Sequence, residues 1–206
     1  MINLNLKCPK LAEFIGVLIG DGFIGSYGRT TKMIQITGHK INDKEYYYKH
    51  LEPLINNIFK TKTHIYEQKN CLRLTIYSKE IFETLKNQLN FPVGKKGQIT
   101  IPKSLITTKE CKLGLIKGIF DTDGSIHLQR NKYPVIAITT ISKNLALQVQ
   151  ELLNEFDFGA YICKSKGEIQ DAFRVTIFGK QKVLKWRELI GSSNPYHIKR
   201  INASVA

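Results

Sequence analysis

Two aspartates stand at the ends of two similar apolar stretches of the chain. Asp21 follows the apolar part of LAEFIGVLIGDGFIG, residues 11–25, and Asp123 follows that of LGLIKGIFDTDGSI, residues 113–126. If the two stretches pair, their carboxylates meet, and paired carboxylates repel each other unless a cation or a proton relieves the repulsion. At a site for phosphodiesters a divalent metal ion is the natural counter-charge. The two aspartates are therefore candidate metal ligands and catalytic residues of a nuclease.

Small residues recur at every fourth position before each aspartate. They are Ala12, Gly16 and Gly20 in the first stretch and Gly114, Gly118 and Thr122 in the second. Glycine in a helix interior costs about 1 kcal/mol relative to alanine, so the pattern indicates a packing requirement. Residues four apart share one helix face, and faces of small residues let two backbones approach closely. We expect a helix pair with both aspartates at one end and with its interface at Gly16, Gly20, Gly118 and Thr122.

The chain contains an internal repeat. RLTIYSK, residues 73–79, returns as RVTIFGK, residues 174–180, and DGFI, residues 21–24, returns as DGSI, residues 123–126. Both pairs lie about 100 residues apart, as a tandem duplication would place them. The sequence predicts two similar halves, residues 1–89 and 105–206, joined by a linker at 90–104 that is rich in Gly, Pro and Lys.

Hydrophobic periodicity gives each half the same order of elements, α-β-β-α-β-β-α. Helices are expected at residues 11–22, 42–59, 79–89, 110–123, 142–156 and 180–190, with a last short helix in the tail after residue 191. Strands are expected at residues 23–27, 33–37, 63–68, 72–77, 125–130, 134–140, 160–165 and 172–178. The predicted fold class is α+β, with two pseudo-symmetric halves that each contain a four-stranded antiparallel sheet.

The composition favours a polyanionic partner. The chain has 31 Lys+Arg against 17 Asp+Glu, a net charge of +14, and a pI near 9.6. Such a balance favours nucleic acid first and an anionic membrane surface second. No apolar run reaches the roughly 18 residues of a membrane span and no signal peptide is visible, so we expect an intracellular protein without a membrane partner. The four cysteines form no CxxC pair, which indicates neither a zinc site nor a disulfide framework.

One face of each predicted sheet is polar and cationic. In LRLTIY, residues 72–77, Arg73 and Thr75 alternate with apolar residues, and Arg174 and Thr176 do the same in FRVTIF, residues 173–178. Ribbons of β-strands can enter the major groove, where Arg, Gln and Thr match base edges and phosphates. The candidate DNA contacts are Arg29, Lys32, Gln35, Thr37, Arg73, Thr75, Gln129, Arg130, Lys132, Thr139, Lys164, Arg174 and Thr176.

The two aspartate stretches resemble a known signature. FIGVLIGDG, residues 14–22, and IKGIFDTDG, residues 116–124, are similar to the nine-residue motif of LAGLIDADG homing endonucleases. In the first copy Ile19 stands where the motif has its first aspartate, and in the second copy Asp121 fills that position. For Asp121 we expect a capping or structural part rather than a catalytic one.

The resemblance implies a fold, an activity and a metal. It implies a monomer whose two sheets form a saddle over a pseudo-palindromic double-stranded DNA target of about 20 base pairs, two helical turns. The enzyme would cut both strands by hydrolysis, with Asp21 and Asp123 binding Mg²⁺ and with Gly20 and Thr122 beside them in the metal site. Two or three Mg²⁺ ions are implied, with Mn²⁺ as a substitute and Ca²⁺ as a non-catalytic ion.

The resemblance also implies basic or polar residues around the metal centre. Lys40 and Lys143 follow the second strand of each half and are the candidates for catalytic residues of this kind. Their neighbours His39 and Ser142, and the lysines that end the fourth strand of each half, are further candidates; these lysines are Lys79 and Lys180.

Two other functions remain as alternatives to the nuclease. A splicing maturase would bind its own intron RNA on the same fold, but a pure RNA binder does not need both Asp21 and Asp123. A DNA-binding regulator would normally carry an added helix-turn-helix domain, for which we expect no room in 206 residues. The location expected for the nuclease is the cytoplasm in a prokaryote and an organelle or the nucleus in a eukaryote.

Overall fold

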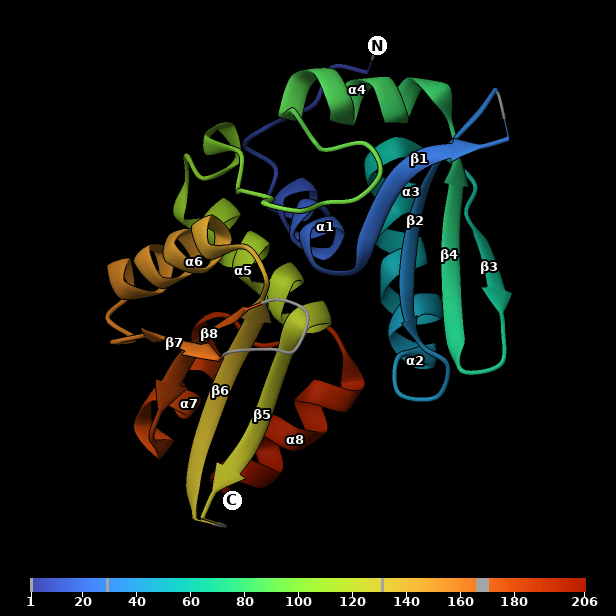
Figure 1. The fold of residues 1–206 in the computed structure, drawn as a ribbon. Coiled ribbons are helices and arrows are strands. Elements are labelled where there is room, and N and C mark those ends of the chain that lie inside the picture. Colours follow the sequence, from blue (N-terminus) through green and yellow to red (C-terminus); the bar gives the residue numbers. More distant parts are fainter. Residues whose placement is uncertain (1, 29, 131, 166–170) are drawn as a thin grey trace.

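The chain folds into two halves of the same plan, which lie side by side (Figure 1). The structure is a computed structural model, and it describes residues 2–28, 30–130, 132–165 and 171–206. Each half contains one four-stranded antiparallel sheet, with strand order β1-β2-β4-β3 in the first and β5-β6-β8-β7 in the second. The predicted α+β fold class is confirmed.

The bounds of the elements follow the predicted periodicity closely. The first half consists of α1 (Pro9–Asp21), β1 (Gly22–Tyr27), β2 (Thr31–His39), α2 (Lys44–Tyr46), η1 (Tyr47–Leu51), α3 (Glu52–Phe59), β3 (His64–Glu67), β4 (Cys71–Tyr77) and α4 (Lys79–Leu89). A short 3₁₀ turn, η2 (Lys103–Leu105), ends the connection. The second half consists of α5 (Lys109–Asp123), β5 (Gly124–Gln129), β6 (Tyr133–Thr140), α6 (Lys143–Glu155), β7 (Tyr161–Ser165), β8 (Ala172–Phe178), α7 (Lys180–Leu189) and α8 (Pro195–Val205).

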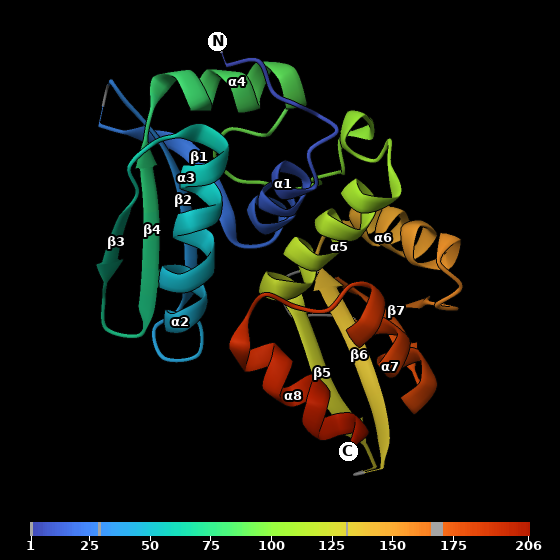
Figure 2. The ribbon, with the colours of Figure 1, turned by 180° about the vertical axis from the view of Figure 1, so that it is seen from behind.

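Each sheet packs one face against helices, and no described helix covers the other face, called the open face (Figure 1). On the second sheet, Val135 and Ala137 of the open face are nevertheless buried. Seen from behind, helices α2, α3, α7 and α8 lie in front of the sheets (Figure 2). The strand residues on that side are fully buried, among them Ile34, Ile36, Leu74, Ile136 and Val175. The open faces of both sheets are seen in Figure 1. Within the described part of the chain, every helix is too short or too polar to cross a lipid bilayer.

The helix predicted at residues 42–59 is interrupted by a π-helical turn. This turn, η1, lies between α2 and α3, and Pro53 stands in the first turn of α3. Proline has no N–H to donate to the carbonyl four residues earlier, and a π turn is one way in which a helix absorbs such a break. The turn buries Tyr47 and brings His50 against α1, where its Nε2 lies 2.7 Å from Glu13 Oε1.

The outer edges of strands β1 and β5 each receive a hydrogen bond from another part of the chain. The acceptor carbonyls lie at equivalent positions, but the donors come from different elements. The linker donates from the Gly94 N–H to the Ile24 carbonyl at 2.8 Å. In the second half, Arg200 of α8 donates from its guanidinium to the Ile126 carbonyl at 2.6 Å. The predicted last short helix is therefore a packed element that covers a sheet edge, which is otherwise a site of unwanted strand pairing.

Candidate active site and nucleic-acid interface

Helices α1 and α5 pack at backbone distance. A Cβ added at Gly114 would lie 2.7 Å from the Pro9 carbonyl oxygen. A Cβ added at Gly16 would collide with the Leu115 carbonyl, and one at Gly118 would collide with the Glu13 carbonyl. A Cβ at Gly20 would collide with the side chain of Thr122. The four residues expected at the interface, Gly16, Gly20, Gly118 and Thr122, therefore lie in it.

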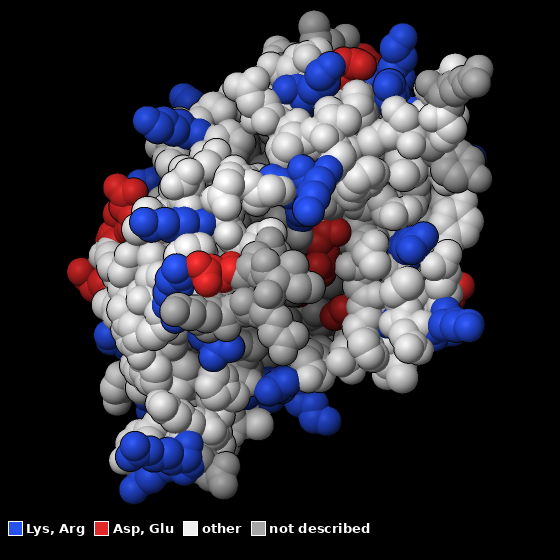
Figure 3. Space-filling view, in the orientation of Figure 1, with Lys and Arg blue, Asp and Glu red and all other residues white. Residues whose placement is uncertain are grey.

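The helix pair brings Asp21 and Asp123 to the same end, at the junction of the two sheets. Space-filling Figure 3 shows acidic side chains on the floor of a hollow between the halves, with Lys and Arg around it. Burial raises the pKa of Asp21 to about 7, and the neighbouring Asp123 charge adds to this rise. Burial also raises the pKa of Asp123 to about 6. Because the two carboxylates are desolvated and repel each other, a cation at this place would stabilise their ionised forms.

Lys96, in the linker, places a positive charge beside the two aspartates. Lys96 extends its ammonium to the end of α1 and donates to the carbonyls of Leu18 at 3.2 Å, Ile19 at 2.8 Å and Gly20. Its positive charge lowers the pKa of both aspartates, while its own burial lowers the pKa of Lys96. The last carbonyls of a helix carry partial negative charge, so they add to the attraction.

The oxygen cluster at the helix ends fits a hard divalent cation. It combines two carboxylates with main-chain carbonyls, which are the ligands that Mg²⁺ and Ca²⁺ prefer. The Lys96 ammonium on the Gly20 carbonyl shows that the cluster attracts a cation. A cavity of about 250 Å³ opens beside it, lined by Gly20, Lys96, Asp123 and Thr139 among others. In the ranges described, no group of three or more His, Cys, Asp or Glu residues could hold a metal ion, so a metal at this place would be held by the two carboxylates and main-chain carbonyls.

Asp121 belongs to a buried polar network instead of the metal cluster. It is 3% exposed and accepts hydrogen bonds from the Ser193 N–H at 2.9 Å and from the Ser192 hydroxyl. Burial raises its pKa to about 6. Asn194, fully buried, donates to Asp43 at 2.8 Å and so ties this loop of the second half to the first. The network holds the end of α5 in place, a structural part for Asp121.

The two lysines expected to be catalytic are not the ones that reach the aspartates. The Lys40 ammonium lies 3.4 Å from Glu67 of β3, which draws it to the outer edge of the first sheet. Lys143 is exposed on the first turn of α6 and makes no ion pair with the residues that the structure describes. The linker supplies the basic side chain in their place. Lys96 was missed because nothing in the run KK at residues 95–96 shows which lysine turns inward.

The further basic and polar candidates have local structural roles. His39 accepts the N–H groups of Ile41 and Asn42 through Nδ1. Ser142 caps α6 and is fully buried. The two lysines that end the fourth strands open helices α4 and α7, and both are exposed; they are Lys79 and Lys180.

Several predicted DNA contacts lie on the open sheet faces. Gln35 and Thr37 of β2 are partly exposed there, Arg73 lies beside Thr37, and Arg174 of β8 lies beside Thr139. Three more candidates are exposed at the tip of the β5–β6 hairpin, namely Gln129, Arg130 and Lys132. Arg29 lies outside the described residues.

Four of the predicted DNA contacts are corrected by the structure. Thr75 is fully buried, and its hydroxyl accepts a hydrogen bond from the Gln35 amide; Thr176 is 3% exposed. Lys32 and Lys164 lie on the helix-covered side of their sheets, because side chains alternate between the two faces along a strand. The Lys32 ammonium lies 5.0 Å from the ring centre of Phe82, and that of Lys164 lies 2.6 Å from Asp171.

A sequence model of the LAGLIDADG-like domain matches residues 110–191, which run from α5 through α7. Residues 110–191 are thus similar to a LAGLIDADG-like domain. The matched segment includes Asp123 and the complete second sheet, so it contains one of the two paired helix ends.

Solved structures share the LAGLIDADG fold over almost the whole chain. I-DmoI in complex with DNA and Ca has a TM-score of 0.64 at 18% identity, over 95% of this chain and 97% of that chain. I-DmoI in complex with DNA and Mn has a TM-score of 0.63 at 17% identity, over 89% and 96%. The N-terminal LAGLIDADG domain of DUF199/WhiA has a TM-score of 0.59 at 14% identity, over 92% and 85%. I-DmoI is a homing endonuclease. At these identities the likeness establishes the fold.

Two curated proteins contain a similar segment. The probable translation initiation factor IF-2 of Methanocaldococcus jannaschii is 28% identical over 212 residues, which cover 96% of this chain and 17% of that protein. The DNA polymerase of Thermococcus hydrothermalis is 26% identical over 153 residues, which cover 74% of this chain and 9% of that protein. The chain thus spans less than a fifth of either relative.

Proposed function

We propose that this protein is a site-specific DNA endonuclease that cuts both strands of its target by metal-dependent hydrolysis. The observation that carries the proposal is the meeting of Asp21 and Asp123 at one end of the α1–α5 pair, with the Gly20 carbonyl turned to the same place. This arrangement lies at the centre of two open sheet faces in a chain of net charge +14. A polyanion with a phosphodiester at its middle is the ligand that fits both features.

The chemistry assigns a part to each group at the centre. Asp21 and Asp123 would hold Mg²⁺, which lowers the pKa of bound water and stabilises charge on the phosphate. Lys96 holds a positive charge beside the same oxygen cluster. Lys96 lies close enough to the same oxygen cluster that its ammonium would also face the phosphate oxygens of a bound DNA, where a cation stabilises developing charge. We infer a monomer, because one chain supplies both halves.

The known relatives support this proposal in two ways. I-DmoI, which shares the fold, has been crystallised with its DNA and with Mn, Mg or Ca. Segments similar to this chain occur inside an initiation factor and a DNA polymerase, proteins of different function. Such a distribution favours a self-contained module inserted into unrelated hosts, as homing would produce. The fold also occurs in DUF199/WhiA, so the fold alone does not establish the activity.

A cleavage selection tests the proposal. The full chain is incubated with a plasmid library of randomised inserts in Mg²⁺, and the linearised ends are captured and sequenced. We expect one recurring sequence at the ends, and no captured ends from a protein that carries both Asp21→Asn and Asp123→Asn. Retarded but uncut plasmids in both Mg²⁺ and Mn²⁺ would contradict the nuclease and leave a DNA-binding protein.

A further inference from the structure

The two open sheet faces carry matched residues near the aspartates and unmatched residues farther out. In Figure 1 the β1–β2 and β5–β6 hairpins run from the ends of α1 and α5 to opposite ends of the molecule. A position along each hairpin therefore corresponds to a distance from the centre of the DNA. The register of the two sheets is the same, which lets each position in one half be compared with its equivalent in the other.

The matched residues are a Thr–Arg pair in each half. Gly22, the first residue after Asp21, pairs with Ile36, and the next pair along β2 and β4 is Thr37 with Arg73. In the second half the same step leads to Thr139 with Arg174.

In the first half, one hydrogen-bond donor of Arg73 has no partner among the described residues. The Arg73 Nε is buried, and no described residue accepts its hydrogen. The side chain of Arg73 as a whole is half-buried and that of Arg174 is exposed. The commonest specific partner of an arginine that reaches a base edge is guanine, through O6 and N7.

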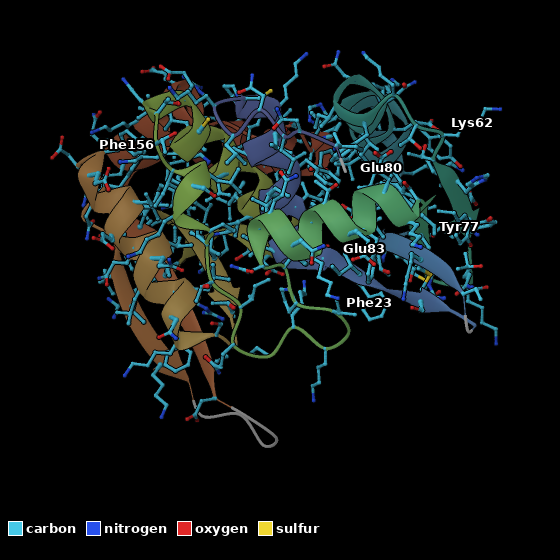
Figure 4. All side chains as sticks on the ribbon, turned by 90° about the horizontal axis from the view of Figure 1, so that it is seen from above. Phe23, Lys62, Tyr77, Glu80, Glu83 and Phe156 are labelled. Carbon is cyan, nitrogen blue, oxygen red and sulfur yellow. The ribbon has the colours of Figure 1, made fainter. Side chains whose placement is uncertain are left out.

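The next position toward each hairpin tip differs between the halves. In β2 it is Gln35, whose amide donates to the Thr75 hydroxyl at 3.2 Å and is thereby oriented. Its equivalent in β6 is Ala137, which is fully buried. The residues paired with them on the edge strands also differ, with Phe23 in β1 and Ser125 in β5. Figure 4 shows Phe23 on the side of β1 away from α4.

We propose that the target repeats one base preference in mirror orientation beside the two cut phosphates, and that this symmetry ends about two base pairs farther out. Arg73 and Arg174 would read the mirrored positions as guanine, and Gln35 would read adenine in one arm, with no counterpart in the other. Two strand residues span about 6.7 Å, close to two base-pair steps. The inference rests on the proposed function, and it specifies which parts of the target are palindromic.

Selection by binding tests this inference without cleavage. The full chain and its variants are each equilibrated with a randomised duplex pool in Ca²⁺, and the bound fraction is sequenced. We expect Arg73→Ala and Arg174→Ala each to reduce the preference for guanine at one of two mirrored positions by about 5- to 150-fold. Arg73→Lys keeps the charge and should lose the preference but not the affinity. Gln35→Ala should remove an adenine preference from one arm only, and Lys32→Ala, on the same strand but the other face, should leave the profile unchanged.

Other outcomes separate this inference from the proposed function. If the wild type enriches a sequence but the two arginine variants lose preference at positions that are not mirrored, the inference is wrong and the DNA-binding function stands. An unchanged profile for Gln35→Ala also overturns the asymmetric arm. If the wild type enriches no sequence at all, the proposed function and the inference fall together.

Discussion

Lys96 is the side chain on which the charge balance of the centre depends. Its ammonium donates to the Ile19 carbonyl at 2.8 Å and lowers the pKa of Asp21 and Asp123. Replacing it by Met would leave the carbonyls without a donor and the carboxylates without a counter-charge. For Lys96→Met we expect a loss of about 1–3 kcal/mol in the free energy of unfolding of the metal-free protein. Chemical denaturation at neutral pH measures it.

The neighbouring lysine offers a matched control for this prediction. Lys95 is exposed and carries the same charge one residue earlier, so Lys95→Met should leave stability and cleavage unchanged. Lys96→Met should in addition lower the rate of cleavage in Mg²⁺. Equal stability and equal cleavage in the two variants would show that Lys96 has no part at the centre.

His197 makes the stability of the second half depend on pH. It is 7% exposed, lies 5.0 Å from the Phe120 ring, and burial lowers its pKa from 6.5 to about 4. Between these values the unfolded chain binds more protons than the folded one, so the stability from neutral His197 is complete above pH 6.5 and is lost as the pH falls toward 4. Relative to His197→Phe, the wild type should lose at most about 1.4 kcal/mol per pH unit in this range.

Thermal unfolding of both proteins across this range provides the measurement. Tyr196→Phe changes an adjacent ring without a group that titrates there, so its curve should run parallel to that of the wild type. A constant difference between wild type and His197→Phe from neutral to acid pH would mean that the imidazole titrates equally in the folded and unfolded states.

At the scale of residues, the sequence predicted the acids better than the bases. Asp21 and Asp123 could be found because a helix of small residues before Asp-Gly appears twice, and the repeat is visible in the letters. Lys96 could not, because its place depends on how an irregular linker folds back over α1. Thr75 and Thr176 have the right strand parity for a DNA contact, but parity does not show that both side chains are buried.

At the scale of elements, the α1–α5 pair sets the position of the centre. A methyl group on Gly118 would collide with the Glu13 carbonyl, a backbone atom that cannot turn away. For Gly118→Ala we expect destabilisation of about 1–3 kcal/mol or more, because over-packing forces backbones apart. The control is Lys109→Ala, an exposed position on the first turn of the same helix. Equal unfolding temperatures for the two variants would show that the helices do not pack this closely in solution.

The helices and strands were predictable because apolar residues recur in them at regular intervals. The interruptions of these elements could not be predicted in this way. Each expected strand is present within a few residues, since alternation continues to the strand ends. The π turn at Tyr47–Leu51 depends on how the helix absorbs Pro53, which a period does not reveal. The sequence predicted a last short helix, but the packing of α8 on β5 through Arg200 is a tertiary contact, which a hydrophobic period does not reveal.

At the scale of the whole molecule, charge should dominate the affinity for DNA. With a net charge of +14 and open sheet faces, binding should release counterions, and log K should fall with log salt by about 0.9 for each phosphate neutralised. Titration of the full chain with its selected duplex in Ca²⁺, at several salt concentrations, measures the slope. A slope near zero would mean that the positive charge does not contact the backbone of the DNA.

The central claim is that Asp21 and Asp123 hold the metal that cuts the DNA. Asparagine keeps the size of each side chain but cannot neutralise the ion as a carboxylate does. Binding should be kept or raised, because each change removes a negative charge beside the phosphates.

The deciding measurement compares Asp21→Asn and Asp123→Asn with the wild type on one selected duplex, by cleavage in Mg²⁺ and by mobility shift in Ca²⁺. The account predicts that each single variant binds the duplex at least as tightly as the wild type and makes no double-strand cut. Full double-strand cutting by either variant would contradict it.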